Sequence, residues 1–179
     1  MAHNSGKKFE QAIEKSVNKA GFLYERFKDN GKFGFSETTR FSSENPCDCF
    51  IFTGSHLVYL ELKSTTNTSI SFNQPCDEKA KGTFMIKPHQ VKSLLTRAKF
   101  PNVVCGLLLD FADRTTSKGV LIEGGTYFIE ITTFKGWADS VTKKSINQTD
   151  AALIGIKIDR TKLKTNYRYD ITKMINDIL

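Results

Sequence analysis

Three charged side chains, Asp48, Glu61 and Lys63, interrupt the apolar stretch PCDCFIFTGSHLVYLELK at residues 46–63. The Gly54-Ser55 pair in its middle favours a two-residue hairpin turn. A turn centred there places Asp48 directly opposite Glu61 on the neighbouring strand, with their Cβ atoms about 5 Å apart. Alternation along the strand puts Lys63 on the same face as Glu61. A three-residue loop would change this register, so the expectation depends on the turn.

Two facing carboxylates repel each other, and partial burial strengthens the repulsion. Lys63 supplies one positive charge and leaves the group net negative. A divalent cation between Asp48 and Glu61 would offset the remainder, because Mg²⁺ prefers carboxylate, carbonyl, water and phosphate oxygens. Such a cation polarises a phosphodiester and lowers the pKa of a bound water, while Lys63 orients that water or stabilises developing charge. The alternative is that these charges only keep an edge hairpin soluble, although apolar residues on both faces favour central strands.

The composition favours a polyanionic partner. The chain has 179 residues and a formal net charge of +7, which favours nucleic acid ahead of an anionic membrane. A surface charged merely for solubility is the alternative. No apolar run approaches the roughly 20 residues that span a bilayer, and no signal-peptide core is present. We therefore expect a cytoplasmic protein with no membrane association.

The four cysteines are scattered and include no CxxC spacing. A disulfide framework is not expected in a cytosolic domain of this size. A zinc site that uses Cys47, Cys49 and either His56 or His89 matches no common spacing. Buried, unmodified thiols are the expected state.

The hydrophobic pattern predicts a single α/β domain at 7–179 behind a flexible leader at 1–6. A helix over 7–20 ends at Gly21, and a hairpin with an Asn30-Gly31 turn occupies 22–44. The later predicted elements, in chain order, are a helix from Pro88, an apolar buried strand at 102–111, a strand at 125–131, a short helix containing Trp137 and a last helix at 169–179. We expect a mixed central β-sheet with helices on both faces.

The spacing of Pro46, Asp48, Glu61 and Lys63 resembles the core motif of the PD-(D/E)xK nuclease superfamily, with one extra residue between Pro and Asp. The segment GKKFEQAIEKSV resembles the first helix of the junction resolvases in this superfamily. Four further segments resemble RecU-type Holliday junction resolvases, of cellular or phage type, in the same order: ELKSTTNTSISF, KPHQVKSLL, YFIEITTFKGW and YRYDITKMINDIL. The resemblance runs from about Gly6 to the C-terminus.

This resemblance implies a restriction-endonuclease-like fold and a homodimer that cuts two opposed strands of a four-way DNA junction during recombination or repair. The cleavage would depend on Mg²⁺, with Mn²⁺ as a substitute. The implied metal ligands are Asp48, Glu61, the carbonyl of Leu62 and Glu10, for which Glu14 is an alternative. Lys63 and Gln90 carry over as catalytic residues beside the two acids, and Thr65 as a phosphate contact.

The chain departs from RecU-type enzymes at 22–44, where those enzymes have a long protruding stalk and this sequence has a compact segment. Its basic residues Arg26, Lys28, Lys32 and Arg40 are predicted to bind DNA. An ordinary amphipathic hairpin is the alternative for this segment. Two other functions remain open: a PD-(D/E)xK nuclease that cuts linear duplex, and a non-catalytic DNA-binding recombination accessory protein.

Overall fold

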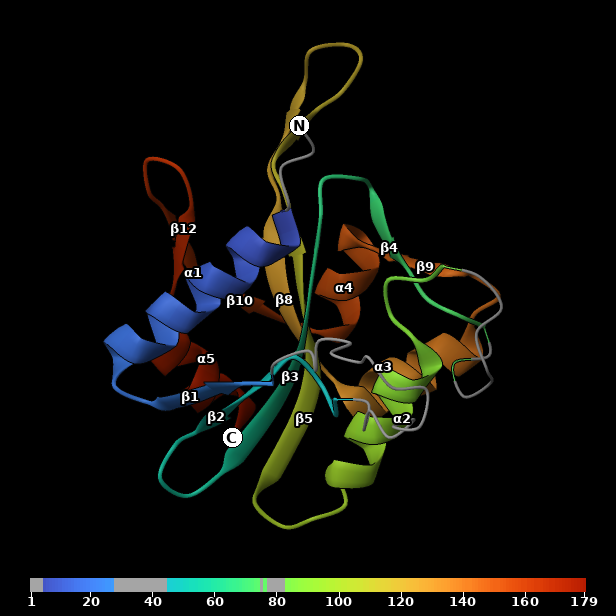
Figure 1. Ribbon diagram of the computed structural model, residues 1–179. Helices are drawn as coiled ribbons and strands as arrows, with labels where there is room; N and C mark the ends of the chain where they lie inside the picture. Colours follow the sequence, from blue (N-terminus) through green and yellow to red (C-terminus); the bar gives the residue numbers. More distant parts are fainter. Residues whose placement is uncertain (1–4, 28–44, 75, 77–82) are drawn as a thin grey trace, which may run out of the picture.

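A six-stranded mixed sheet forms the centre of the computed structural model, which describes residues 5–27, 45–74, 76 and 83–179 (Figure 1). Its strand order is β1-β2-β3-β5-β8-β10. β3 and β5 are parallel, and the other neighbouring strands are antiparallel. The strands are β1 (Leu23–Arg26), β2 (Cys49–Phe52), β3 (Leu57–Thr65), β5 (Val103–Phe111), β8 (Gly125–Glu130) and β10 (Ile156–Ile158).

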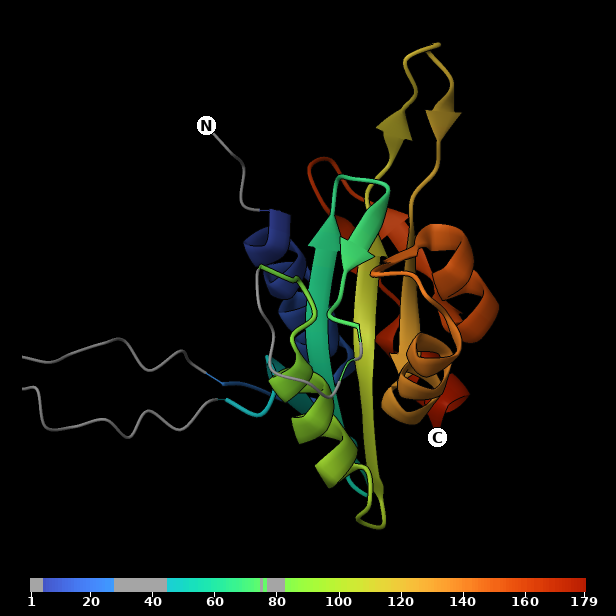
Figure 2. The same cartoon turned by 90° about the vertical axis from the view of Figure 1, so that its right-hand side faces the viewer.

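Five helices cover the two faces of this sheet among the described residues (Figures 1 and 2). α1 (Ser5–Ala20) and α5 (Ile171–Ile178) pack on one face, and α2 (Pro88–Arg97), α3 (Ile131–Ser140) and α4 (Gln148–Ile154) pack on the other. α1, α2, α3 and α5 each bury several residues along one side, as amphipathic helices do, whereas α4 buries only Ala151. The predicted architecture, a mixed sheet between two helical layers, is confirmed.

β5 lies between the two cores, which explains its continuous apolar sequence. Leu107 and Leu109 belong to the core under α2, α3 and α4, whereas Leu108 belongs to the core under α1 and α5. Successive side chains of a strand point to opposite faces, so a strand covered on both sides needs apolar residues at every position. The predicted buried strand at 102–111 is confirmed.

Three short ribbons add to the central sheet. β4 (Ser69–Ser71) pairs with β9 (Ser145–Asn147), and β11 (Arg160–Lys162) pairs with β12 (Tyr167–Tyr169). β6 (Arg114–Thr115) pairs with β7 (Leu121–Ile122) and projects beyond the rest of the molecule, at the top of Figure 1. The sequence reading did not anticipate these ribbons or α4, because each segment is too short to show a clear period.

The amino-terminal region differs in part from the prediction. α1 begins at Ser5, so the last two residues of the predicted leader are helical, and it ends before Gly21, whose φ of 81° suits glycine. β1 pairs with β2, from Leu23 opposite Phe52 to Arg26 opposite Cys49. The predicted Asn30-Gly31 turn lies outside the described residues. No helix in the described part of the chain is long and apolar enough to cross a membrane.

Candidate active site

The β2–β3 hairpin has the register that the sequence predicted. Ile51 lies opposite Val58, and Cys49 opposite Leu60. Gly54 has a φ of 94°, which a tight hairpin turn with glycine at its first central position requires. Asp48 immediately precedes β2, so a continuation of this register places Asp48 opposite Glu61.

Asp48 is held against the middle of β3. Its Oδ2 accepts a hydrogen bond of 2.7 Å from the backbone N–H of Leu62. The same oxygen lies 3.9 Å from Lys63 Nζ, and its side chain is 29% exposed. The N–H and C=O of one residue in a strand point to the same edge, so the Leu62 carbonyl also faces the Asp48 side.

Glu61 is the most deeply buried acid of the group, with 1% of its side chain exposed. Its Oε1 lies 2.5 Å from Lys63 Nζ and also accepts a hydrogen bond from Gln90 Nε2. Burial raises the pKa of Glu61 to about 7, against the opposing effect of Lys63 and with a further increase from Asp48. The carboxyl is therefore poised between its two protonation states near neutral pH.

Gln90 reaches this group from the first turn of α2. Pro88 occupies the start of that helix, and Gln90 is its third residue. Gln90 Oε1 accepts a hydrogen bond of 2.8 Å from the backbone N–H of Lys87, so its amide nitrogen is turned toward Glu61. The structure therefore brings Asp48, Glu61, Lys63 and Gln90 together from two strands and one helix.

Lys63 carries the positive charge of the group. Burial of its side chain opposes protonation, but Glu61 and Asp48, with a contribution from Glu10, hold the pKa of Lys63 above its usual value. The ammonium therefore stays charged at neutral pH.

The donor set fits a hard divalent cation. Glu61 Oε2 is buried and has no hydrogen-bond partner among the described residues, and an unsatisfied buried carboxylate oxygen is costly. With an Asp48 oxygen and the Leu62 carbonyl, it would supply the few oxygen ligands that Mg²⁺ takes from protein while keeping its waters. Within the described ranges, no group of three or more His, Cys, Asp or Glu side chains is placed to hold a metal.

Glu10, a predicted metal ligand, forms an ion pair with Arg26. Its Oε2 lies 2.6 Å from Arg26 Nη2, so the pair joins a predicted ligand to a predicted DNA-binding residue. The charge of Glu10 also helps to hold the pKa of Lys63 above its usual value. The charge of the alternative acid Glu14 contributes to raising the pKa of Tyr24.

The other predicted DNA contacts divide into two groups. Lys28, Lys32 and Arg40 lie outside the described residues. Thr65 is 4% exposed, and its Oγ1 accepts a hydrogen bond of 3.0 Å from the N–H of Asn67. A side chain buried at the end of β3 offers little surface to a phosphate, and a phosphate contact by Thr65 stays a prediction.

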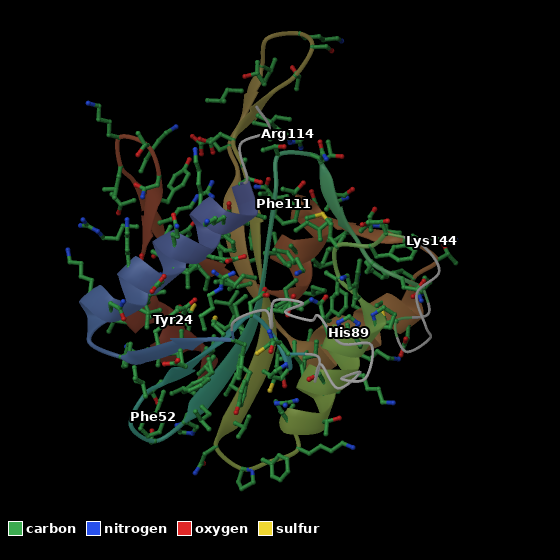
Figure 3. The ribbon with its side chains drawn as sticks, in the orientation of Figure 1. Tyr24, Phe52, His89, Phe111, Arg114 and Lys144 are labelled. Carbon is green, nitrogen blue, oxygen red and sulfur yellow. The ribbon has the colours of Figure 1, made fainter. Side chains whose placement is uncertain are left out.

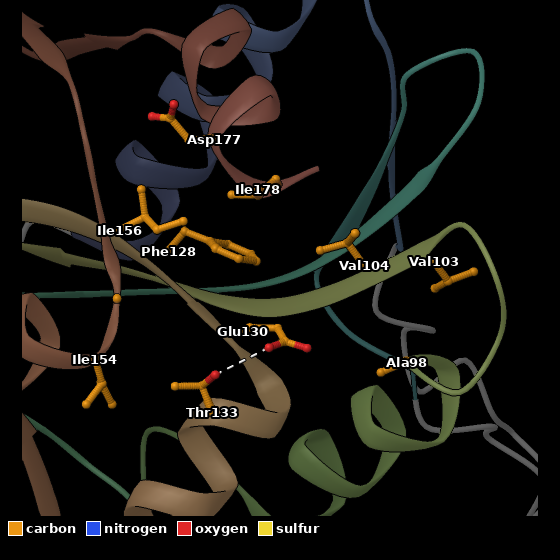
Figure 4. A pocket seen from close by; sticks show the side chains of 11 residues that line it. Ala98, Val103, Val104, Phe128, Glu130, Thr133, Ile154, Ile156, Asp177 and Ile178 are labelled. Carbon is orange, nitrogen blue, oxygen red and sulfur yellow. Dashed lines mark hydrogen bonds between the residues drawn. The ribbon is translucent and has the colours of Figure 1, made fainter.

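Two other candidate sites, the cysteines and a cavity beside Glu130, lack a comparable group of acids around a lysine. All four cysteines are buried free thiols, as expected. A cavity of about 320 Å³ is lined by residues from both helical layers, among them Thr133 of α3 and Asp177 of α5 (Figure 4). None of the residues that line it belongs to the group around Glu61.

Sequence reasoning missed a polar network at the carboxyl end of β5. Arg160 Nη1 lies 2.7 Å from Asp110 Oδ1, and Arg160 Nη2 lies 3.3 Å from Asp113 Oδ1. Thr126 also donates to Asp110, at 2.6 Å. The one signal in the sequence was an aspartate at the end of an apolar strand, which does not identify a partner 50 residues away.

Comparison with solved structures gives the class of fold. Hjc of Archaeoglobus fulgidus, described as a Holliday junction resolvase from an archaeal hyperthermophile, matches with a TM-score of 0.50 and 18% sequence identity over 85% of this chain and 95% of its own. The mixed sheet and its two helical layers thus form a restriction-endonuclease-like fold. No protein-family model matches the chain.

Comparison with curated proteins gives the family. The SPbeta prophage-derived uncharacterized protein YotM of Bacillus subtilis (strain 168) is 32% identical over 190 residues, which cover 99% of this chain and 88% of that protein. The chain belongs to the family of this prophage protein.

Proposed function

We propose that the protein is a divalent-metal-dependent endonuclease of the PD-(D/E)xK superfamily that cleaves four-way DNA junctions, as RecU-type resolvases do. The observation that carries the proposal is the meeting of Asp48, Glu61 and Lys63 around one buried carboxylate, with Lys63 Nζ 2.5 Å from Glu61 and 3.9 Å from Asp48. A buried net negative group of this kind needs a cation. Residues 7–179 would then form one nuclease domain, active in the cytoplasm.

Each residue has a role that follows from its contacts. Asp48, Glu61 and the Leu62 carbonyl would hold Mg²⁺, or Mn²⁺ in its place, with Glu10 as a further candidate. When bound, the cation polarises the phosphodiester and makes a bound water more acidic. Lys63 stays charged and stabilises the negative charge that develops on the phosphate. Gln90 orients Glu61 through the hydrogen bond to Oε1.

Junction cleavage requires two sites. A four-way junction has approximate two-fold symmetry, so a homodimer with one site in each protomer would cut two opposed strands. The net charge of +7 supports binding of a polyanion. The fold shared with Hjc and the phage origin of the relative are consistent with a recombination enzyme.

The test compares a mobile four-way junction with a linear duplex of matched sequence, each incubated with Mg²⁺ or with EDTA. Asp48→Asn is the inactive variant, and Asp139→Asn on the exposed surface of α3 is its matched control. We expect paired, symmetric nicks in the junction only, which disappear with EDTA and with Asp48→Asn but persist with Asp139→Asn.

The other outcomes separate the alternatives. Cleavage of the linear duplex at a similar rate would identify a nuclease of another specificity. Junction binding with no cleavage in any divalent metal would identify a non-catalytic accessory protein. Cleavage that continues in EDTA would contradict the metal site.

A further inference from the structure

The β6–β7 ribbon, residues 114–122, is a well-formed arm that the catalytic group does not use. Phe111 ends the buried part of β5, and Arg114 lies beyond it at the base of the arm (Figure 3). Arg114 pairs with Ile122, and Thr115 with Leu121. Both views show the arm projecting away from the two helical layers (Figures 1 and 2).

The tip of the arm has a defined turn. The N–H of Gly119 donates to the Thr116 carbonyl at 2.9 Å, and Thr116 N–H donates to the Val120 carbonyl at 2.9 Å. Gly119 has a φ of 78°, the left-handed conformation that completes a hairpin of this length. The side chains at the tip are therefore presented in a fixed arrangement.

The base of the arm is anchored by Asp113. Its Oδ1 accepts a hydrogen bond of 2.9 Å from the N–H of Gly124 on the returning strand. The same carboxylate binds Arg160 at 3.3 Å and Tyr167 at 2.8 Å, both from the β11–β12 ribbon. A Cβ at Gly124 would lie 1.9 Å from the Phe111 carbonyl oxygen, so the two strands cross too closely there for any other residue.

The exposed surface of the arm combines apolar and basic groups. Val120 and Leu121 are 59% and 63% exposed, and Lys118 is exposed beside them. Two adjacent, exposed apolar side chains on a projecting tip are available for contact with a partner. Lys118 and Arg114 add positive charge along the arm, which favours a polyanion, while Asp113 and Glu123 flank its base.

The reach of the arm matches the dimensions of DNA. Leu109 lies beside Lys63 in the β3–β5 register, and the ten residues from Leu109 to Lys118, joined by nine Cα–Cα steps, span at most about 30 Å. One turn of B-DNA is about 34 Å long. Neighbouring strands lie about 4.8 Å apart, so a two-stranded ribbon fits a major groove about 12 Å wide.

We propose that the β6–β7 arm enters the major groove of a duplex branch about one helical turn from the cleaved phosphate. Val120 and Leu121 contact base edges there, where thymine methyl groups offer apolar surface. Lys118 and Arg114 contact the phosphates that border the groove. This inference rests on the proposed function and adds a second DNA contact remote from the catalytic group.

A second copy of the chain is the competing occupant. Two such tips would bring Lys118 and Arg114 of each copy together, and like charges at close range repel. A DNA groove offers negative charge and apolar base edges together. Charge complementarity therefore favours DNA.

The test measures binding of the Asp48→Asn protein to a junction whose branches are longer than two helical turns. The arm variants are Lys118→Ala and the double variant Val120→Ser with Leu121→Ser. The matched controls are Lys99→Ala and Phe100→Ser, since this basic and 63% exposed apolar pair lies in the loop at the opposite, amino end of β5. Affinity, its salt dependence, and dimethyl sulfate protection of guanine N7 in the major groove are recorded for each protein.

We expect the double arm variant to bind the junction roughly 10-fold more weakly and to lose N7 protection about one turn from the cleavage position. Lys118→Ala should reduce the slope of log affinity against log salt by about 1, the value of one phosphate contact. The controls should match the parent protein in affinity and protection.

Three results would overturn the inference. If the arm variants bind the junction and protect guanine N7 like the parent protein, the arm does not contact DNA. In that case, junction cleavage by the wild-type protein would still support the proposed function. Arm variants that convert a dimer to a monomer in light scattering would identify the arm as a protein interface. A wild-type protein that neither binds nor cleaves the junction would end the proposed function, and the arm contact with it.

Discussion

Asp48 Oδ2 accepts a hydrogen bond of 2.7 Å from the backbone N–H of Leu62, the residue between Glu61 and Lys63. This contact ties the acid before β2 to the centre of the parallel β3–β5 pair. Because the bond uses the strand backbone, the position of Asp48 depends on hairpin register more than on the neighbouring side chains.

Replacement of Asp48 should separate its structural role from its chemical role. Asp48→Asn keeps an oxygen that can accept from Leu62 N–H, so its free energy of unfolding should stay within about 1 kcal/mol of wild type. Asp48→Ala leaves this N–H without its partner and should cost about 1–2 kcal/mol. Urea denaturation in EDTA measures both, and equal stabilities for the two variants would contradict the hydrogen bond. Both variants should lose cleavage.

Glu61 should destabilise the metal-free fold at neutral pH. Its pKa is raised from 4.5 to about 7 by burial, so the folded state resists ionisation that the unfolded state undergoes. In EDTA, the free energy of unfolding should therefore fall by up to about 3 kcal/mol as the pH rises from about 4.5 to 7. Above pH 7 it should stay level. Glu61→Gln should remove most of this fall. Mg²⁺ should raise the melting temperature of wild type more at pH 8 than at pH 5, and a flat profile would contradict the buried charge.

Lys63 should matter for cleavage and not for metal binding. Its ammonium lies between the two acids, where it offsets part of the negative charge that attracts a cation. Lys63→Met should reduce cleavage at least about 100-fold and leave Mn²⁺ affinity equal or higher, as measured by calorimetry. Lys99→Met on the exposed surface is the control and should change neither quantity. A loss of metal affinity in Lys63→Met would show that the lysine helps to build the site.

Gln90 should act as a positioning residue. Gln90→Ala removes the donor to Glu61 and the acceptor for Lys87 N–H, so cleavage should fall roughly 10-fold and stability by about 1 kcal/mol. Gln90→Glu keeps the acceptor for Lys87 and adds a carboxylate beside Glu61. It should keep the stability of α2 and move the pH profile of cleavage upward, because a neighbouring negative charge raises the pKa of Glu61 further. An unchanged pH profile would contradict the contact.

Asp113 should stabilise the fold above acidic pH. The backbone N–H of Gly124, together with Tyr167 and Lys162, lowers the pKa of Asp113 from 3.8 to about 2. Its stabilising contribution is therefore present above about pH 4 and disappears as the pH falls toward 2. Asp113→Ala should cost about 1–3 kcal/mol at pH 7, and the difference from wild type should shrink on acidification. Hydrogen exchange should show faster exchange in the arm of the variant.

Local sequence signals determined the elements that present the candidate site. The Gly54-Ser55 turn sets the register of its hairpin, and a hairpin register fixes which side chains face each other. Pro88 begins α2, which places Gln90 in the first turn, and Gly21 ends α1. These features depend on residues a few positions apart, so a single sequence contains the information.

The tertiary structure decided which charges are buried and which are paired. From the sequence, Glu10 was predicted to bind a metal and Arg26 to bind DNA. In the folded chain, Glu10 Oε2 and Arg26 Nη2 lie 2.6 Å apart. Thr65 becomes buried at the end of β3, where it pairs with Phe111 of β5. Arg160 reaches Asp110 and Asp113 only when β11 folds beside the end of β5. Burial and ion pairing depend on contacts between residues far apart in the chain, and local sequence patterns do not predict such contacts.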